Sequence, residues 1–237
     1  VGVSVTQLDY GEERVTTVTQ PEGTGDRWAA KDLALALSYG RNLTDRFSIG
    51  GSVKYIQQSV WNETASAFAM DVGLLFITNF NNMRLGMSIT NFGTELQMDG
   101  RDLLNRIDLD PGALGNNETI TARLKTESWP LPLFFRVGLA MDVIDAASYK
   151  FTLAADALHP TDNSEIINLG GEFSYSNLLF LRAGYKSLFR QESEEGMTAG
   201  IGLKLYSGGS LFWTFNYTYA DFGLFEEIQM FDLGVSF

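Results

Sequence analysis

Cysteine and histidine are almost missing from this chain, and their scarcity removes several classes of function. The 237 residues contain no cysteine and one histidine. Disulfides, thiolate metal sites and cysteine nucleophiles are therefore excluded. His159 precedes Pro160 in an expected external turn, and the pattern places no partner nearby for metal ligation or a catalytic triad. We assign His159 no role.

Long apolar runs and clustered basic residues are also absent. No stretch approaches 18 consecutive apolar residues, so a membrane-spanning helix is excluded and any membrane role must be interfacial or of the barrel type. There are 17 Lys and Arg against 29 Asp and Glu, which gives a net charge of −12. Phosphate binding requires clustered basic side chains, so nucleic acid is not expected as a partner.

The sequence carries no motif of a known catalytic or cofactor site. Gly200-Ile201-Gly202 lacks the third glycine of a dinucleotide fingerprint, and no P-loop, G-x-S-x-G or H-E-x-x-H sequence occurs. The acidic run Glu192, Glu194 and Glu195 is interpreted as a solvated loop, with binding of a divalent cation or cation-bridged lipopolysaccharide as the alternative. We expect no enzymatic activity, no cofactor and no resident metal.

Residues that favour strands and turns are abundant instead. Hydrophobic residues make up 45% of the chain and aromatic residues 13%, with 17 Phe and 24 Gly. Mean hydropathy is near zero. A barrel wall alternates lipid-facing apolar with lumen-facing polar residues, so this average does not argue against a membrane barrel.

Apolar and polar residues alternate along almost the whole chain. Leu33, Leu35 and Leu37 share one face of an expected strand, while Ala34 and Ala36 lie on the other. The same period recurs in enough segments to predict twelve strands, most of them long enough to cross hydrocarbon when tilted. The segments are 1–8, 33–39, 47–55, 68–74, 84–89, 135–143, 151–156, 167–173, 179–186, 200–205, 211–219 and 231–237.

The connections between these strands alternate in length. One set is short: 41–45, 79–82, 145–148, 176–177 and 207–209. The other set is mostly longer, with 62–63 as the exception: 10–26, 62–63, 92–130, 159–163, 188–196 and 221–226. Outer-membrane barrels alternate short periplasmic turns with longer external loops. The sequence therefore predicts an all-β protein, a single domain over residues 1–237 that forms an antiparallel transmembrane β-barrel.

Two segments depart from this regular plan. The chain begins at Val1 without Met and already within a strand, so we expect an N-terminal truncation that removes the export signal and at least one strand. The external loop 92–130 is too long for a plain connection. We expect Asp99 to cap a short helix there that carries Leu103, Leu104 and Ile107, in a loop that leans into the lumen, caps it or presents a docking surface.

Twelve charged residues are predicted to face the lumen, six of each sign. Our main interpretation is an interior of compensating ion pairs that stiffen the barrel, with a polar conduit or ligand pocket as the alternative. A pore for ions of one sign would carry an excess of the other. The residues are Asp32, Asp71, Asp142, Asp156, Glu172 and Asp232, and Lys54, Arg84, Arg136, Arg182, Lys186 and Lys204.

Aromatic residues gather at the ends of the expected strands. Amphipathic rings belong at the headgroup level of a membrane, so girdles are the expected use, with carbohydrate stacking as the alternative. The residues are Tyr39, Tyr55, Trp61, Trp129, Tyr185, Tyr206, Trp213, Tyr217 and Tyr219.

Several stretches resemble known proteins. The alternating end 231–237, which closes on Phe237, resembles the C-terminal signal that bacterial outer-membrane proteins offer to the barrel assembly machinery. Across most of residues 30–237, the order of further motifs is similar to that in PorV/PorQ-type proteins. These motifs are 47–55, 69–76, 85–93, 153–160, 168–173 and 181–186.

This resemblance implies a fold and a role. The family is related to FadL-type fatty-acid transporters, whose barrels have fourteen strands, so the chain would supply about 12 strands of a probable 14. It implies a component of type IX secretion in the bacterial outer membrane, which receives cargo at the translocon and hands it to a surface attachment complex. It supplies no catalytic residue to transfer to this chain.

Three hypotheses follow, in order of preference. The first is a docking barrel whose partners are outer-membrane lipid and lipopolysaccharide, secreted protein cargo and secretion-system subunits. The second is a FadL-like transporter or channel for hydrophobic or small solutes. The third, an outer-membrane enzyme, would need an acid-base cluster that the pattern does not show.

Overall fold

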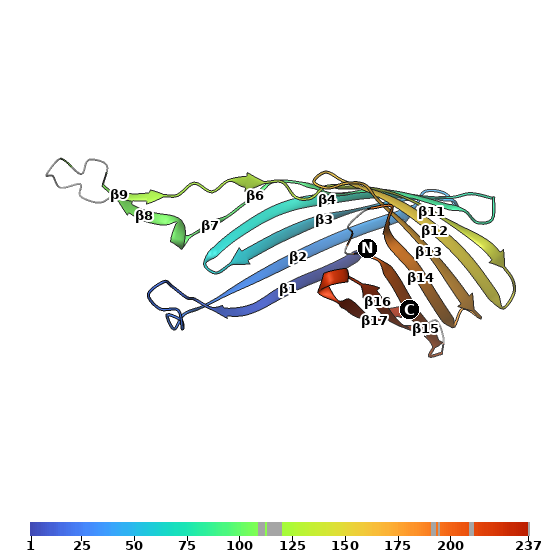
Figure 1. Cartoon of the computed structure of the whole chain (residues 1–237). Helices are drawn as coiled ribbons and strands as arrows, with labels where there is room; N and C mark the ends of the chain where they lie inside the picture. Colours follow the sequence, from blue (N-terminus) through green and yellow to red (C-terminus); the bar gives the residue numbers. More distant parts are fainter. Residues whose placement is uncertain (109–111, 113–119, 191–192, 194, 209–210, 237) are drawn as a thin grey trace. The chain divides into compact units, whose positions relative to one another are not determined.

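The chain folds almost entirely into β-strands. The structure is a computed structural model that describes residues 1–108, 112, 120–190, 193, 195–208 and 211–236. Each of the twelve predicted segments lies largely within one long strand (Figure 1). These strands are β1 (Gly2–Arg14), β2 (Arg27–Asn42), β3 (Phe47–Val60), β4 (Glu63–Ile77), β5 (Arg84–Gly93), β11 (Phe134–Asp145), β12 (Tyr149–Pro160), β13 (Ile166–Tyr175), β14 (Leu179–Leu188), β15 (Met197–Tyr206), β16 (Phe212–Asp221) and β17 (Glu227–Ser236).

The long strands follow one another in the sheet in the order of the chain. The order is β1-β2-β3-β4-β5-β11-β12-β13-β14-β15-β16-β17, and a short strand, β7 (Asp99–Gly100), pairs with β4 as the thirteenth member. Hairpin pairing is antiparallel throughout β11 to β17. This up-and-down order is the one by which antiparallel barrels are built. The all-β antiparallel fold class is confirmed.

The contacts divide the chain into two compact units. Unit 1 comprises Val1–Gly40, Gly50–Val72 and Thr90–Pro132. Unit 2 comprises Arg41–Ile49, Gly73–Ile89 and Leu133–Phe237. The single domain over residues 1–237 stays a prediction.

One face of the strands is apolar and exposed. Leu35, Leu181 and Phe215 are each more than 40% exposed, and Val137 is half-buried. A water-soluble sandwich would bury such residues in a common core. Exposed apolar surface on this scale marks an interaction with a membrane or a partner. Neither 3₁₀ helix, η1 (Arg101–Leu103) nor η2 (Gly223–Phe225), and no other described helix, has the length and hydrophobicity of a membrane span.

The long connection after β5 is folded, but not as predicted. It contains β6 (Leu96–Gln97), β7, η1, β8 (Leu104–Ile107), β9 (Ile120–Arg123) and β10 (Ser128–Trp129). β6 pairs with β10, and β8 pairs with β9.

The helix expected from Asp99 to Ile107 is therefore wrong. Only Arg101–Leu103 forms one turn of 3₁₀ helix, which Gly100 precedes. Leu104 to Ile107 is a strand because pairing with Ile120–Arg123 satisfies its backbone groups. The Asp99 carboxylate binds the Arg123 guanidinium at 2.7 Å and caps no helix.

Candidate functional site: the polar face of the sheet

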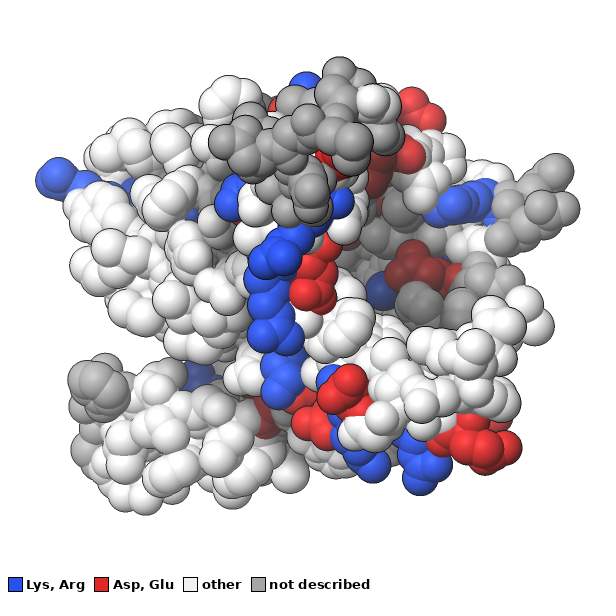
Figure 2. Space-filling view, turned by 90° about the vertical axis from the view of Figure 1, so that its left-hand side faces the viewer, with Lys and Arg blue, Asp and Glu red and all other residues white. Residues whose placement is uncertain are grey.

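The side chains that alternate with the exposed apolar residues form what we call the polar face. It includes the twelve charged residues predicted to face a lumen, and three pairs of them lie in direct contact. These pairs are Lys54–Asp71, Arg84–Asp142 and Arg182–Glu172. Figure 2 shows acidic and basic side chains next to one another, beside broad surface without charge. Compensating ion pairs thus occur on this face, while the orientation of the twelve residues toward a lumen stays a prediction.

In unit 1 an ion pair is joined to the end of the long connection. Lys54 Nζ lies 2.6 Å from Asp71 Oδ2 and donates to Asn91 Oδ1 at 3.0 Å. The backbone N–H of Asn91 donates to Asp71 Oδ1, and its side-chain amide donates to the carbonyl of Pro132. Asn91 has a positive φ of 64°, which asparagine tolerates better than most residues. These contacts link β3, β4 and β5 to residue 132.

In unit 2 a nearly buried carboxylate holds two cations. Asp142 Oδ1 is 3.0 Å from Arg84 Nη2 and accepts a hydrogen bond from Thr152 Oγ1 at 2.8 Å. Its Oδ2 is 3.3 Å from Lys150 Nζ. The Asp142 side chain is only 2% exposed. Lys150 was not among the predicted residues, although it shares the even-numbered face of Thr152, so alternation extended to the strand end would have found it.

A second network joins side chains from four strands of unit 2. Arg182 Nε donates to Glu172 Oε2 at 2.7 Å, and Arg182 Nη1 donates to Asn216 Oδ1 at 2.9 Å. The Asn216 amide donates in turn to Asp232 Oδ2 at 2.9 Å. The network joins β13, β14, β16 and β17. Asn216 links Arg182 to Asp232, and so connects the carboxylates of Glu172 and Asp232. The sequence prediction missed Asn216 because it considered charged residues only.

Arg182 reaches Asn216 over β15, the strand that lies between their own strands in the sheet. Gly202 makes this crossing possible. A Cβ atom on Gly202 would lie 2.7 Å from Asn216 Oδ1 and 3.2 Å from Arg182 Nη1. A larger residue at this position would occupy the space of the guanidinium.

A third set of contacts runs along β12, β13 and β14. The Asn168 amide donates to Asp156 Oδ2 at 3.2 Å, and Asn168 Oδ1 accepts from the backbone N–H of Ser187. Glu195 accepts from Ser187 Oγ and from Lys186 Nζ at 3.0 and 3.2 Å. Glu195 is therefore not the simply solvated residue that the sequence predicted. Glu192 and Glu194 lie outside the described residues.

The remaining predicted residues have weaker contacts. Asp32 accepts a hydrogen bond from the Tyr10 hydroxyl, and Lys204 lies over the Phe212 ring. Arg136 is exposed and has no ion pair among the described residues. His159 is exposed and lies 3.2 Å from Glu165. Within the described part of the chain, no group of three or more His, Asp or Glu side chains is arranged to hold a metal ion.

Unit 2 also contains a shallow pocket on its polar face. The pocket has a volume of about 390 Å³, within the range of small-molecule sites. Its floor includes Ala154, Gly170, Gly184 and Gly200, and Gly170 lies opposite both Ala154 and Gly184 in the sheet. Polar groups surround this floor: Asp156, Asn168, Glu172, Arg182, Lys186, Thr198 and Thr218.

In unit 1 part of the long connection that follows β5 packs on the polar face of β4. We call residues 94–108 and 120–132 the covering segment. Leu96 and Leu131 of this segment pack with Ala65, Ala67 and Ala69 of β4 into a buried apolar cluster. Ile56, Met98 and Trp129 pack against the cluster. Trp129, one of the residues expected in an aromatic girdle, is partly buried against this cluster.

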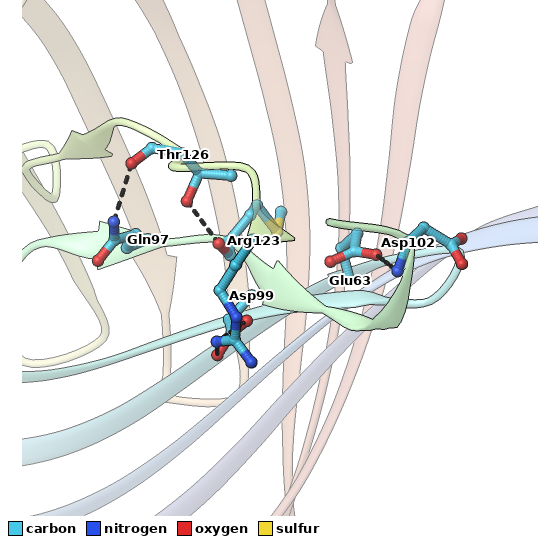
Figure 3. A network of polar contacts seen from close by, with 7 residues as sticks. Glu63, Gln97, Asp99, Asp102, Arg123 and Thr126 are labelled. Atoms are coloured by element: carbon cyan, nitrogen blue, oxygen red, sulfur yellow. Dashed lines mark hydrogen bonds and ion pairs between the residues drawn. The ribbon is translucent and has the colours of Figure 1, made fainter. Parts of the chain in front are cut away.

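Polar contacts hold the covering segment in shape (Figure 3). Arg123 Nη1 lies 2.7 and 2.8 Å from the two carboxylate oxygens of Asp99. The Gln97 amide donates to the Thr126 carbonyl, and the Thr126 hydroxyl donates to the Met98 carbonyl at 2.6 Å. Glu63, at the start of β4, accepts from the backbone N–H of Asp102. The structure thus places Leu96 and Leu131 on the polar face of β4, and the choice among the three arrangements expected for this loop stays a prediction.

Comparison with known proteins shows the fold but no family. No family description and no curated protein matches the sequence. Among solved structures the chain is similar to a CymD monoaromatic hydrocarbon channel, with a TM-score of 0.52 and 10% sequence identity over 88% of this chain and 73% of that one. At this identity the likeness is one of fold. It agrees with the predicted all-β, barrel-type fold and gives no support to the likeness to PorV/PorQ-type proteins.

Proposed function

We propose that this protein is a β-barrel channel of the bacterial outer membrane that carries hydrophobic or other small solutes. The observation that supports this most is the exposure of large apolar side chains on one face of long antiparallel strands whose other face is polar. In a membrane barrel the apolar face meets lipid and the polar face meets the lumen. The fold likeness to a hydrocarbon channel points in the same direction.

The charges of the polar face bear on the kind of solute. The predicted inward charges are six of each sign, and several of them are held in ion pairs or hydrogen bonds. Selection of ions of one sign requires a ring or patch of the other. The proposed channel is therefore expected to favour solutes without net charge.

Uptake into liposomes tests this function. The full-length protein is reconstituted, and entry of radiolabelled toluene, glucose and benzoate is compared with that in protein-free liposomes of the same lipid. We expect the protein to accelerate entry of at least one uncharged solute more than that of benzoate. Equal entry of all three with and without protein would contradict a channel.

The PorV/PorQ resemblance leads to a second candidate, a docking barrel of a type IX secretion system. The observation that favours it is the β8–β9 hairpin, whose exposed side chains include Leu104, Ile107 and Ile120. An isolated hairpin of this kind is marginally stable in water, so a partner would stabilise it. If the tagged full-length protein retains secreted proteins and a Leu104→Ser/Ile107→Ser variant does not, docking is supported. Solute uptake without any protein capture speaks against it.

A further inference from the structure

The floor of the unit 2 pocket includes three glycines, with the side chains of Thr198, Thr218 and Arg182 close beside them. Gly170, Gly184 and Gly200 lie on three neighbouring strands, β13, β14 and β15. Glycine permits a close approach to the backbone that a larger side chain would prevent. A small ring can therefore rest its C–H face directly on this part of the sheet.

The charged groups around the floor cancel. Asp156 and Glu172 supply two negative charges, and Arg182 and Lys186 supply two positive charges. Each is already engaged, as in the Arg182–Glu172 pair at 2.7 Å and the Lys186–Glu195 pair at 3.2 Å. A charged ligand would have to break such a pair to be compensated. The pocket thus suits an uncharged molecule.

Other polar side chains around the floor can still form hydrogen bonds with a ligand. Thr198 and Thr218 have no side-chain hydrogen bond within the described part of the chain. The Thr198 hydroxyl oxygen lies 3.0 Å from the place where a Cβ on Gly184 would stand, so it leans over the floor. A purely apolar ligand would take these hydroxyls from water without replacing their hydrogen bonds, which is unfavourable.

We infer that this pocket binds an uncharged, hydroxyl-rich molecule of about one ring, the class of monosaccharides and cyclic polyols. Hydroxyl groups both donate and accept, so they can bond Thr198, Thr218 and the free donors of Arg182 as well as the carboxylates. The C–H face of the ring lies on the glycine floor. The inference rests on the proposed function, because the solute must have access to the polar face.

Saturation-transfer NMR on the full-length protein in detergent micelles tests this inference. D-glucose is the first probe and myo-inositol the second. We expect a saturable signal for at least one of them that toluene and benzoate do not displace. The inference is overturned if neither probe gives a saturable signal, or if toluene or benzoate displaces the bound sugar.

Substitution of Gly170 locates the site. A Cβ at this position would meet only Ala183 O, at 3.5 Å, which is ordinary contact. Gly170→Val should therefore fit the sheet while it fills the pocket and abolishes the saturable signal. Gly86→Val is the matched control on the polar face of β5 outside the pocket, where a Cβ would meet no atom within 4 Å. Equal loss in both variants overturns the assignment of the site.

Removal of the hydroxyls tests the chemistry without a change in shape. Thr198→Val and Thr218→Val keep the side-chain volume, and each should weaken binding by about three- to tenfold, the loss of one hydrogen bond. Thr214→Val, on the polar face of β16 outside the pocket, is the control and should bind like the unchanged protein. Undiminished binding by the Thr198→Val/Thr218→Val double variant overturns the hydroxyl role.

The two proposals fail in distinguishable ways. Protein-dependent uptake of solutes into liposomes without a saturable sugar signal overturns the pocket alone. A saturable sugar signal without uptake of any solute overturns the channel alone. Circular dichroism of each variant shows whether its strand content is retained, and the threonine variants keep the test decisive if Gly170→Val does not fold.

Discussion

The polar faces of unit 1 and unit 2 differ in what lies on them. In unit 1 the covering segment lays Leu96 and Leu131 on the alanines of β4, and a dry apolar cluster forms there. Ion pairs occur on the polar face of both units, but in unit 2 this face also contains the pocket with its glycine floor. The difference teaches that small residues on a strand have two uses. Alanines paired with apolar partners form a packing surface, while glycines among polar side chains leave a concave, wettable surface.

Four predictions test this contrast, and the largest effect is expected at Asp142. Asp142→Asn leaves Arg84 and Lys150 without their buried counter-charge, which should lower the free energy of unfolding by about 3 kcal/mol. This value lies at the lower end of the losses caused by removing one partner of a buried ion pair, because the Arg84 and Lys150 side chains are partly exposed. Urea unfolding in micelles measures it, and the exposed Asp145→Asn serves as control. A loss no greater than that of the control would show that the carboxylate is not needed for stability.

The next effect concerns the covered face of unit 1. Leu96→Ala removes the most buried side chain that the covering segment contributes, and should weaken its attachment to β4 by about 2 to 3 kcal/mol. Limited proteolysis should then cleave residues 94–132 faster. Leu104→Ala, at an exposed position of the same segment, should leave the cleavage rate unchanged. Unchanged cleavage in Leu96→Ala would mean that the apolar cluster does not hold the segment.

A smaller effect is expected in the Glu172–Arg182–Asn216–Asp232 network of unit 2, which is partly exposed. Arg182→Met removes the contacts to Glu172 and Asn216, but the two ion-pair side chains are 42% and 33% exposed. Solvent screening therefore limits the loss in unfolding free energy to about 1 kcal/mol or less. Urea unfolding should place this variant between Asp142→Asn and Arg136→Met. A loss as large as that of Asp142→Asn would erase the distinction between the two networks.

The smallest effect is expected next to the exposed β8–β9 hairpin. Leu124 follows β9 and is more than half exposed, so Leu124→Ser should change the unfolding free energy by less than about 0.5 kcal/mol. If the docking candidate is correct, the same variant should capture less secreted protein in a pull-down. A clear loss of stability would instead mean that this part of the covering segment is packed within the protein.

The strands and their two faces were accessible from the sequence because the cause is local. In a strand, successive side chains point to opposite faces, so Leu179 and Leu181 must share a face that Arg182 does not. The twelve strands were found in this way, as was the membership of residues such as Asp142 and Arg182 in the polar face. The helix predicted over residues 99–107 was wrong because its structure has a non-local cause. There the pairing of β8 with β9, a strand further along the chain, outweighs the local signals for a helix.

The sequence by itself determined the alternation, and with it the strands, the exposed apolar face and the balance of charge on the other face. Only the tertiary structure decided which polar groups meet. Arg84 and Asp142 are 58 residues apart in the chain, and Arg182 reaches Asn216 because Gly202 lies between them. Such contacts depend on strand register and on the space that a neighbouring strand leaves, and neither is encoded in the local period.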